Sequence, residues 1–225
     1  MNCNFRLYEE QLERAESSNE FAKVQTFSND LAEAYIRLAT FCDEQYNVIV
    51  NYMNSKDYED KQAILEEMSH DHKMRSEERV KGTTTTILER NSNLDKQELS
   101  AKLEERNNYL CLALNNYAKA LCKTEKFDLK VYRLISLWFA NPDNDKVDQI
   151  IGATLNEIPD FKFVGLLYQL CARLVTAGSS GNFSNLLEKL ILRIGTNHPY
   201  HTIPIVLALV NSNADQLIEK PNRSS

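Results

Sequence analysis

Apolar residues in the first half of the chain recur at steps of three and four, the spacing that places side chains on one face of an α-helix. The first stripe consists of Leu31, Tyr35, Leu38, Cys42, Tyr46, Ile49 and Met53. The second consists of Leu99, Leu103, Leu110, Leu114, Tyr117 and Leu121. Each stripe predicts a long amphipathic helix with one buried face. We expect the two helices to pair as an antiparallel hairpin or bundle.

Polar residues indicate where these two helices begin. Ser28 or Asn29 suits the N-cap of the first helix, because its side chain can accept a hydrogen bond from a backbone N–H of the first turn. The second helix is expected to begin near Asn93 or Asp95, with an acidic residue in its first turn, and to run to Lys123.

The stretch between the two stripes, Asp57–Lys81, is highly charged. Its strong apolar residues are Ile64, Leu65 and Met68. A helix in this stretch would therefore be poorly buried over its C-terminal half. The run Thr83–Thr86 that follows is β-branched, and we expect it to interrupt or loosen such a helix.

From Phe127 onward the pattern changes to short apolar stripes separated by proline, glycine or asparagine. The stripes are Phe127, Val131, Leu134 and Trp138; Val147, Ile151, Leu155 and Ile158; Phe163, Leu167, Leu170 and Leu174; Phe183, Leu187, Leu190 and Ile194; and the run Val206 to Val210. Pro204 is expected inside the first turn of the last helix, where a missing N–H costs little. Short amphipathic helices cannot bury their faces singly, so they must stack as pairs. The predicted fold is all-α: an α-solenoid of stacked helix pairs, with long helices in the N-terminal half.

Composition agrees with long helices and narrows the range of partners. The 225 residues include only 6 glycines and 5 prolines, so turns are few. A net charge of −6 argues against nucleic acid as the main partner, because neutralising phosphates needs a basic surface. The apolar stretch Ile203–Val210 is too short to cross a bilayer, which needs ~20 such residues. The N-terminus lacks the apolar run of a signal peptide.

The 5 cysteines are scattered and form no C-x-x-C pair. This pattern is typical of free thiols in the cytosol or nucleus. Cys111 and Cys122 lie at helical positions that favour burial. Trp138 is predicted to anchor the core between helices.

Three short strings could carry chemistry, and each has a simpler interpretation. His70–His72 could ligate a metal, but no neighbouring Cys or His completes a four-ligand zinc site, so we interpret it as a solvated surface. Ala177–Asn182 resembles a phosphate loop but lacks the following Lys-Ser/Thr, and we interpret it as a flexible connection between helices. Asp160–Lys162 shares two letters with the kinase D-F-G motif, and no other kinase motif accompanies it, which indicates chance.

The strongest candidate is a pair of histidines around Pro199, at a corner between two predicted helices. His198 and His201 could hydrogen-bond free helix-end carbonyls there, which favours a structural corner made by these three residues. A catalytic site would need a nucleophile or carboxylate partner, which the sequence does not supply. No residue of the chain is therefore predicted to be catalytic, to bind a cofactor or to ligate a metal.

A set of longer strings follows one order along the chain. They are Leu38–Tyr46, Asn51–Met53, Lys61–Leu65, Tyr132–Trp138, Phe161–Phe163, Leu167–Arg173, His198–Thr202 and Ile205–Asn211. Together they resemble the FAT region of the ATM-type (ataxia-telangiectasia mutated) kinases, within the phosphatidylinositol 3-kinase-related kinase family. The resemblance runs from about Phe27 to Pro221.

This resemblance implies a nuclear Ser/Thr protein kinase that responds to DNA double-strand breaks and phosphorylates Ser/Thr-Gln sites. It also implies that an α-solenoid FAT region embraces the kinase domain. ATP and magnesium would belong to that domain, beyond the end of this sequence. The expected organisation is an unplaced segment 1–26, a helical-repeat FAT-type segment 27–213, and a tail 214–225 leading towards the kinase domain. Within 27–213, long helices are expected up to about residue 123 and short helix pairs from about residue 127.

The predicted function is that of a regulatory FAT-region fragment that scaffolds the kinase domain. The last short helix is apolar on nearly all sides, so Leu207 and Val210 are predicted to contact another domain of the parent protein. The expected partners are that kinase domain and other proteins, with neither nucleic acid nor membrane bound directly. The alternatives are a free-standing helical-repeat scaffold and an enzyme with an unusual site at His198 and His201.

Overall fold

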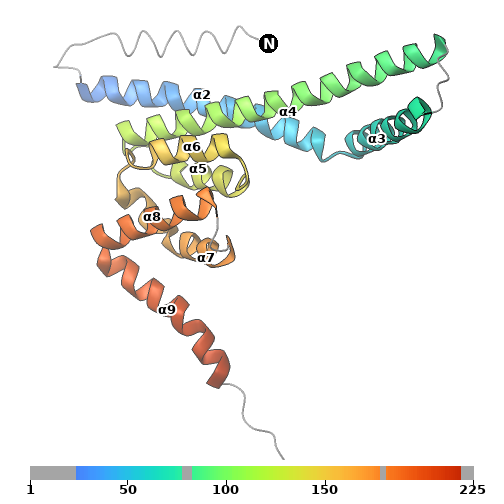
Figure 1. Cartoon of the computed structure of the whole chain (residues 1–225). Coiled ribbons are helices and arrows are strands. Elements are labelled where there is room, and N and C mark those ends of the chain that lie inside the picture. The colour runs from blue at the N-terminus through green and yellow to red at the C-terminus, as the bar shows by residue number, and fades with distance from the viewer. Residues whose placement is uncertain (1–23, 78–82, 178–180, 219–225) are drawn as a thin grey trace, which may run out of the picture. The chain divides into compact units, whose positions relative to one another are not determined.

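The computed structural model describes residues 24–77, 83–177 and 181–218, and side chains within 28–68, 90, 92–174 and 181–211 (Figure 1). Every regular element in these ranges is helical, which confirms the all-α prediction. The elements are α2 (Val24–Met53), α3 (Lys56–Glu77), α4 (Thr83–Lys123), α5 (Lys130–Phe139), α6 (Asp145–Thr154), the 3₁₀ helix η2 (Asp160–Leu166), α7 (Leu167–Ala177), α8 (Asn182–Asn197) and α9 (Pro199–Ile218). The chain forms two compact units, Met1–Ala39 with Leu114–Ser225, and Thr40–Ala113.

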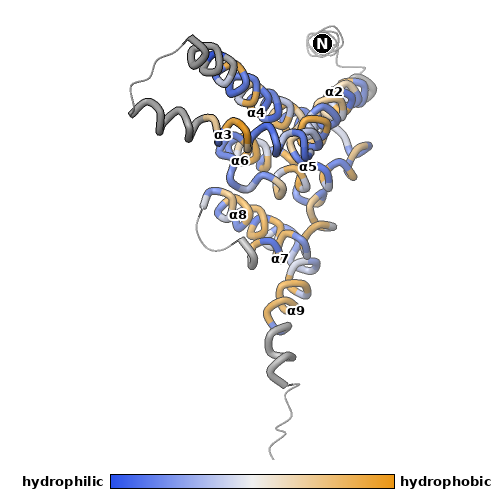
Figure 2. Tube along the Cα trace, turned by 90° about the vertical axis from the view of Figure 1, so that its right-hand side faces the viewer, coloured by the Kyte–Doolittle hydropathy of each residue, from blue (hydrophilic) through white to orange (hydrophobic). Residues whose placement is uncertain are grey.

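The short helices of the first unit stack in succession, as the α-solenoid prediction requires. α5 packs against α6 and η2, η2 and α7 pack against α8, and α9 packs against α7 and α8. Residues of the predicted stripes fill the space between these helices, and the tube coloured by hydropathy shows apolar segments in α8 and α9 (Figure 2). Fully buried members include Leu134, Trp138, Ile151, Phe163, Leu167, Leu187 and Ile194.

Polar contacts define the turn between α5 and α6. The Asn141 side chain donates to the Leu137 carbonyl at 2.8 Å, which satisfies a free carbonyl at the end of α5. Asn144 is the N-cap of α6, and its Oδ1 accepts from the backbone N–H of Lys146 at 3.1 Å and Val147 at 3.4 Å. These two caps explain why the two apolar stripes on either side of this turn form separate helices.

The N-terminal part of α2 and the C-terminal part of α4 run antiparallel in the same unit. The Ser28 hydroxyl donates to the Lys123 carbonyl at 2.9 Å, and the Lys119 ammonium lies 5.2 Å from the centre of the Tyr35 ring. The prediction that Ser28 or Asn29 caps the first helix is wrong, because α2 already begins at Val24. These side chains instead form tertiary hydrogen bonds with residues at the C-terminal end of α4, although their sequence pattern is that of a helix cap.

The unit Thr40–Ala113 pairs the remaining parts of α2 and α4 and adds α3. Cys42 and Tyr46 of α2 are buried, and the Arg106 guanidinium of α4 lies 5.6 Å from the centre of the Tyr46 ring. α3 is held by Lys61, whose ammonium lies 2.9 Å from a Glu98 carboxylate oxygen. Antiparallel pairing of the two long stripes is thus seen within each unit.

Three predicted helix boundaries are wrong. α4 begins at Thr83, about ten residues before the predicted start, because the small helix penalty of β-branched residues does not by itself prevent a helix. Pro199 occupies the first position of α9, so Pro204 lies inside the helix and not in its first turn. The stripe from Val147 ends as a helix at Thr154, and Ile158 is buried in the connection that follows.

Candidate functional site at the α8–α9 corner

The predicted corner lies where α8 ends and α9 begins. The backbone N–H of His198 donates to the Ile194 carbonyl at 2.7 Å and closes the last turn of α8. The His198 carbonyl accepts from the backbone N–H of His201 and of Thr202, each at 3.2 Å, and from the Thr202 hydroxyl at 3.0 Å. Pro199 follows as the first residue of α9, where its fixed φ suits a helix start and no donor is lost. The backbone of His198 therefore serves the ends of both helices.

Close contact between small groups fixes the two helices at this corner. A Cβ added to Gly195 of α8 would lie 3.4 Å from the Thr202 methyl group. Thr202 is buried, His198 is half-buried and the His201 side chain is exposed. The structure therefore places the two histidines at the corner with different environments.

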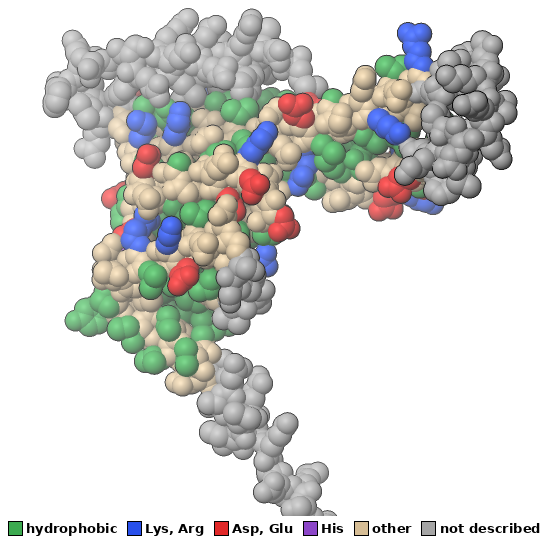
Figure 3. Space-filling view, in the orientation of Figure 1, with side chains coloured by type: hydrophobic (Ala, Val, Ile, Leu, Met, Phe, Trp, Pro, Cys, Tyr) green, Lys and Arg blue, Asp and Glu red, His purple; other side chains and the backbone are tan. Residues whose placement is uncertain are grey.

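Two faces of α9 differ in what covers them. Thr202, Ile205 and Leu209 recur at helical spacing, and the first is buried and the others half-buried. A second series consists of Tyr200, Ile203, Leu207 and Val210, whose exposed fractions are 91%, 55%, 54% and 67%. We call this second series the open face of α9. Figure 3 shows hydrophobic side chains gathered over the α8–α9 corner and along α9.

The open face is therefore apolar and largely solvent-exposed in this chain. Val206, at the edge of the face, is 36% exposed. An amphipathic helix usually buries one stripe of side chains. In α9 the series Thr202, Ile205 and Leu209 already forms that stripe, because α9 packs against α7 and α8. A contiguous exposed apolar patch is typical of a contact with another protein surface. The predicted contact residues Leu207 and Val210 both lie on it, and the contact itself stays a prediction.

The other strings with possible chemistry receive no site in the structure. The side chains of His70 and His72 lie outside the described residues, as do residues 178–180 of the predicted phosphate loop. Among the side chains that are described, no group of three or more His, Cys, Asp or Glu is placed to hold a metal. Asp160 is engaged with α8: it forms an ion pair with Arg193 and accepts a hydrogen bond from Asn197.

Burial disfavours the thiolate form of two of the described cysteines, Cys122 and Cys171. Burial raises the pKa of the Cys122 thiol, and burial likewise raises the pKa of the Cys171 thiol. A raised pKa keeps a thiol protonated, and the thiolate is the reactive form. These two cysteines are therefore packing residues.

The sequence reasoning missed one residue that the structure singles out, Lys162. It stood in a string interpreted as a chance match to a kinase motif, yet its ammonium group lies in the interior and bonds to the end of α4. The sequence carried no signal for its burial, because a lysine between Phe161 and Phe163 ordinarily lies at the surface. Which partners it finds is decided by residues about forty positions earlier.

Comparison with known proteins identifies the fold first. No family model matches the chain. A solved structure described as the FAT and kinase domain of CtTel1 matches 88% of this chain and 13% of its own chain, with a TM-score of 0.68 and 24% sequence identity. A complete CtTel1 dimer with C2 symmetry matches 87% of this chain and 7% of its own, with a TM-score of 0.62 and 25% identity. The chain therefore has the helical fold of the FAT region of the phosphatidylinositol 3-kinase-related kinases.

Curated relatives then specify the kinase. The serine-protein kinase ATM of Sus scrofa is 37% identical over 195 residues, which are 86% of this chain and 6% of that protein. The serine/threonine-protein kinase ATM of Drosophila melanogaster is 30% identical over 194 residues, 84% of this chain and 7% of that protein. The chain is homologous to a segment of the ATM/Tel1 serine/threonine protein kinases, and it spans less than a tenth of the length of these relatives. The resemblance found in the sequence is confirmed.

One further finding concerns membranes. None of the helices in the described ranges contains a stretch long and apolar enough to span a bilayer.

Proposed function

We propose that this chain is a regulatory FAT-region segment of an ATM-like serine/threonine protein kinase, and that it scaffolds the kinase domain of the same parent protein. Homology over 86% of the chain supports the parent's class. The parent would act in the nucleus in the response to DNA double-strand breaks, with ATP and magnesium bound in its kinase domain. The proposal includes no direct contact of this segment with nucleic acid or membrane.

The observation that carries the scaffolding role is the open face of α9. This helix packs on α7 and α8 through one stripe and leaves a second apolar stripe, including Leu207 and Val210, in solvent. Burying such a stripe against another domain is favourable by about 25 cal/mol per Å² of apolar surface removed from water. In this proposal, residues 27–213 form the scaffold, the tail 214–225 leads towards the kinase domain, and the open face contacts another domain of the parent.

The corner of His198, Pro199 and His201 has a structural part in the proposal. It sets the direction in which α9 leaves α8, through the hydrogen bonds of the His198 backbone and the close approach of Gly195 to Thr202. An enzymatic role for the two histidines has no support in the contacts described above.

The test is Leu207→Asp in the full-length kinase that contains this segment. A carboxylate at that position stays solvated in the isolated chain but would be buried without a partner at an interdomain contact, which is strongly unfavourable. We expect kinase activity towards a Ser-Gln peptide to change at least about threefold, corresponding to a fraction of that penalty, while the isolated chain keeps its melting temperature and helical circular dichroism.

Ala208→Asp is the matched control. Ala208 is exposed on the same helix but lies about 100° around it from Leu207, away from the open face. The control should leave kinase activity and melting temperature unchanged. Unfolding of the isolated chain by Leu207→Asp would show that Leu207 belongs to the core and would refute the contact. A transcript that stops without encoding a kinase domain would favour a free-standing scaffold.

A further inference from the structure

The C-terminal end of α4 lacks the residues that usually end a helix. The sequence after Lys123 is Thr124, Glu125, Lys126 and Phe127, with neither glycine nor proline. The last carbonyls of a helix have no partner within the helix and need another donor. Two carbonyls at this end are those of Leu121, in the last turn of α4, and of Thr124, the residue after the helix.

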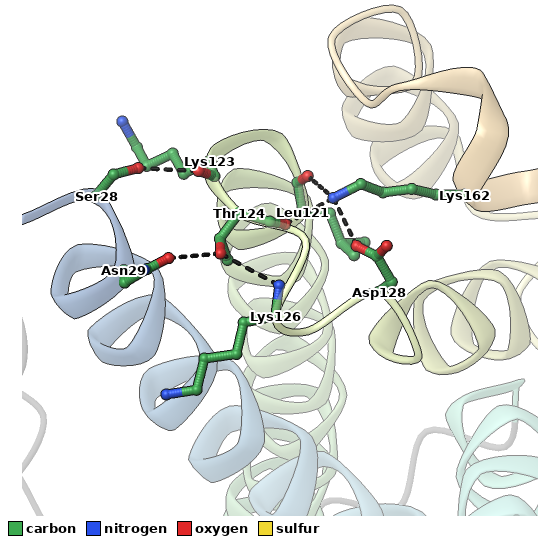
Figure 4. A network of polar contacts seen from close by, with 8 residues as sticks. All are labelled: Ser28, Asn29, Leu121, Lys123, Thr124, Lys126, Asp128 and Lys162. Atoms are coloured by element: carbon green, nitrogen blue, oxygen red, sulfur yellow. Dashed lines mark hydrogen bonds and ion pairs between the residues drawn. The ribbon is translucent and has the colours of Figure 1, made fainter. Parts of the chain in front are cut away.

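A lysine from a distant part of the chain supplies that donor. The Nζ of Lys162, in η2, donates to the Leu121 carbonyl at 2.7 Å and to the Thr124 carbonyl at 2.7 Å (Figure 4). The same ammonium lies 2.8 Å from a carboxylate oxygen of Asp128. The Lys162 side chain is 1% exposed and that of Asp128 is 35% exposed. The positive charge therefore lies in the interior, surrounded by three oxygen partners.

The opposite side of this helix end is bonded to α2. The Thr124 hydroxyl donates to Asn29 Oδ1 at 2.7 Å and accepts from the backbone N–H of Lys126 at 3.2 Å. The Lys126 ammonium lies 3.5 Å from a Glu33 carboxylate oxygen. Residues 121–128 are thus held by side chains from α2 on one side and from η2 on the other, as Figure 4 shows.

We propose that Lys162 is a conformational latch: its ammonium, together with the carbonyls of Leu121 and Thr124 and the Asp128 carboxylate, couples the end of α4 to the short helices that begin with α5. These four groups are the Lys162 latch. While the latch is closed, η2 cannot move relative to the end of α4 without breaking bonds to a buried charge. Opening it frees the connection 124–129 to act as a hinge.

Two physical arguments favour a latch over ordinary packing. The ammonium is compact, so it can donate to the carbonyls of Leu121 and Thr124 while its charge is paired with the Asp128 carboxylate. A buried charge is tolerated only while its partners are in place, so the arrangement is either closed or open and has no favourable intermediate. The consequence for the kinase rests on the function proposed above, because motion of α5–α9 would reach the parent through the open face of α9.

The experiment measures the latch in the 225-residue chain itself, by amide hydrogen exchange with mass spectrometry. Lys162→Met keeps the length and apolar stem of the side chain and removes the charge. We expect exchange in residues 121–131 and 160–166 to accelerate at least about tenfold, because those amides then open without unfolding of the whole unit. Exchange in α8 should stay within about twofold of the wild type.

Two further variants keep the outcome decisive. Lys146→Met, at an exposed lysine of α6, makes the same chemical change away from the latch and should alter no helix. Asp128→Asn removes only the ion pair at a partly exposed site, and we expect a smaller acceleration, about threefold, confined to residues 121–131. If Lys162→Met fails to fold, Asp128→Asn decides the question.

Unchanged exchange in residues 121–131 for both variants would refute the latch. An acceleration of equal size in every helix would also refute it, because Lys162 would then contribute only to global stability. Both results are measured by hydrogen exchange and not by kinase activity. The experiment can therefore refute the latch without bearing on the proposed scaffolding role.

Discussion

The short helices α5–α8 and the helix α3 of the unit Thr40–Ala113 differ in how their apolar side chains are covered. In α5–α8 the residues of each stripe are nearly all buried, and side-chain hydrogen bonds of Asn141 and Asn144 close the turn between α5 and α6. In α3, Tyr58 and Leu65 are buried while Ile64, at 57% exposure, faces solvent. α3 also forms ion pairs of Lys61 with Glu98 and, at 3.7 Å, with Asp95.

This difference shows that an apolar stripe stabilises a helix in proportion to how many neighbouring helices cover it. A short helix of a solenoid is covered by the helices before and after it, so one stripe contacts two partners. Among the described side chains of α3, residues 56–68, few are covered, and exposed ion pairs contribute little because water and salt screen them. We therefore expect unequal responses to substitution in the two regions.

The largest expected effect is at the centre of the short helices. Trp138 is completely buried, its ring centre lies 4.9 Å from that of Phe183, and its indole N–H donates to Asp148 at 3.2 Å. Trp138→Ala should lower the free energy of unfolding by about 3–5 kcal/mol, through the cavity and the lost contacts. Urea denaturation followed by circular dichroism measures it. Tyr168→Ala, at an exposed aromatic residue of α7, is the control and should change stability by less than about 0.5 kcal/mol.

A smaller effect is expected in α3. Leu65→Ala should cost about 2 kcal/mol, the lower end of the range for a buried leucine, because most other described side chains of α3 are exposed. Hydrogen exchange of the α3 amides is the appropriate measurement, since a sparsely packed helix can open without global unfolding. The neighbouring Ile64→Ala removes a comparable side chain from an exposed position and should leave exchange unchanged. Equal effects of the two substitutions would contradict the proposed difference between the regions.

The smallest expected effect concerns pH. Burial raises the pKa of the Asp148 carboxyl, and nearby Asp145 and Asp143 raise it further, against a lowering by the Trp138 hydrogen bond. The folded state therefore favours the protonated carboxyl over the ionised one. The stability that the protonated Asp148 contributes is present at low pH and is lost as the pH rises through the folded pKa. Asp148→Asn, which can still accept from Trp138, should stabilise the chain more at pH 7 than near pH 4.

Glu98 of α4, the partner of Lys61 in α3, serves as the comparison, because its pKa is shifted in the opposite direction. Its hydrogen bond from Lys61 lowers the pKa of the Glu98 carboxyl, so this contribution is present at neutral pH and is lost on acidification. Unfolding free energies from urea titrations at several pH values, for wild type, Asp148→Asn and Glu98→Gln, test both signs. A constant difference between wild type and Asp148→Asn across this range would show that Asp148 titrates normally.

Much of the fold could be predicted from the sequence because helical periodicity is a local property. The stripe from Phe183 to Ile194 is buried at every predicted position, and the stripe from Leu31 is buried as far as Ile49. The predicted burial was wrong where it depends on how far a neighbouring helix extends. Leu103, assigned to a buried face, is 40% exposed, since the spacing of residues fixes a face but not the length over which another helix covers it.

The candidate site divides in the same way. The apolar surplus of α9 was visible in the sequence, because too many of its positions are apolar for a single buried stripe. Which residues form the open face was decided by the packing of α7 and α8 on Thr202, Ile205 and Leu209. The predicted boundaries 1–26, 27–213 and 214–225 stay a prediction.

The sequence by itself determined the helical class, the change from long to short helices near residue 125, and the resemblance to the ATM-type kinases, because periodicity and matching strings are read along the chain. The end of α4 at Lys123 was also predicted from the sequence, but only the tertiary structure decided how the carbonyls at that end are satisfied and why Lys162 is buried. The donor for the carbonyls of Leu121 and Thr124 comes from about forty residues later, and a hydrogen bond depends on distance in space. No local pattern around Lys123 or Lys162 encodes that meeting; folding of the intervening helices brings it about.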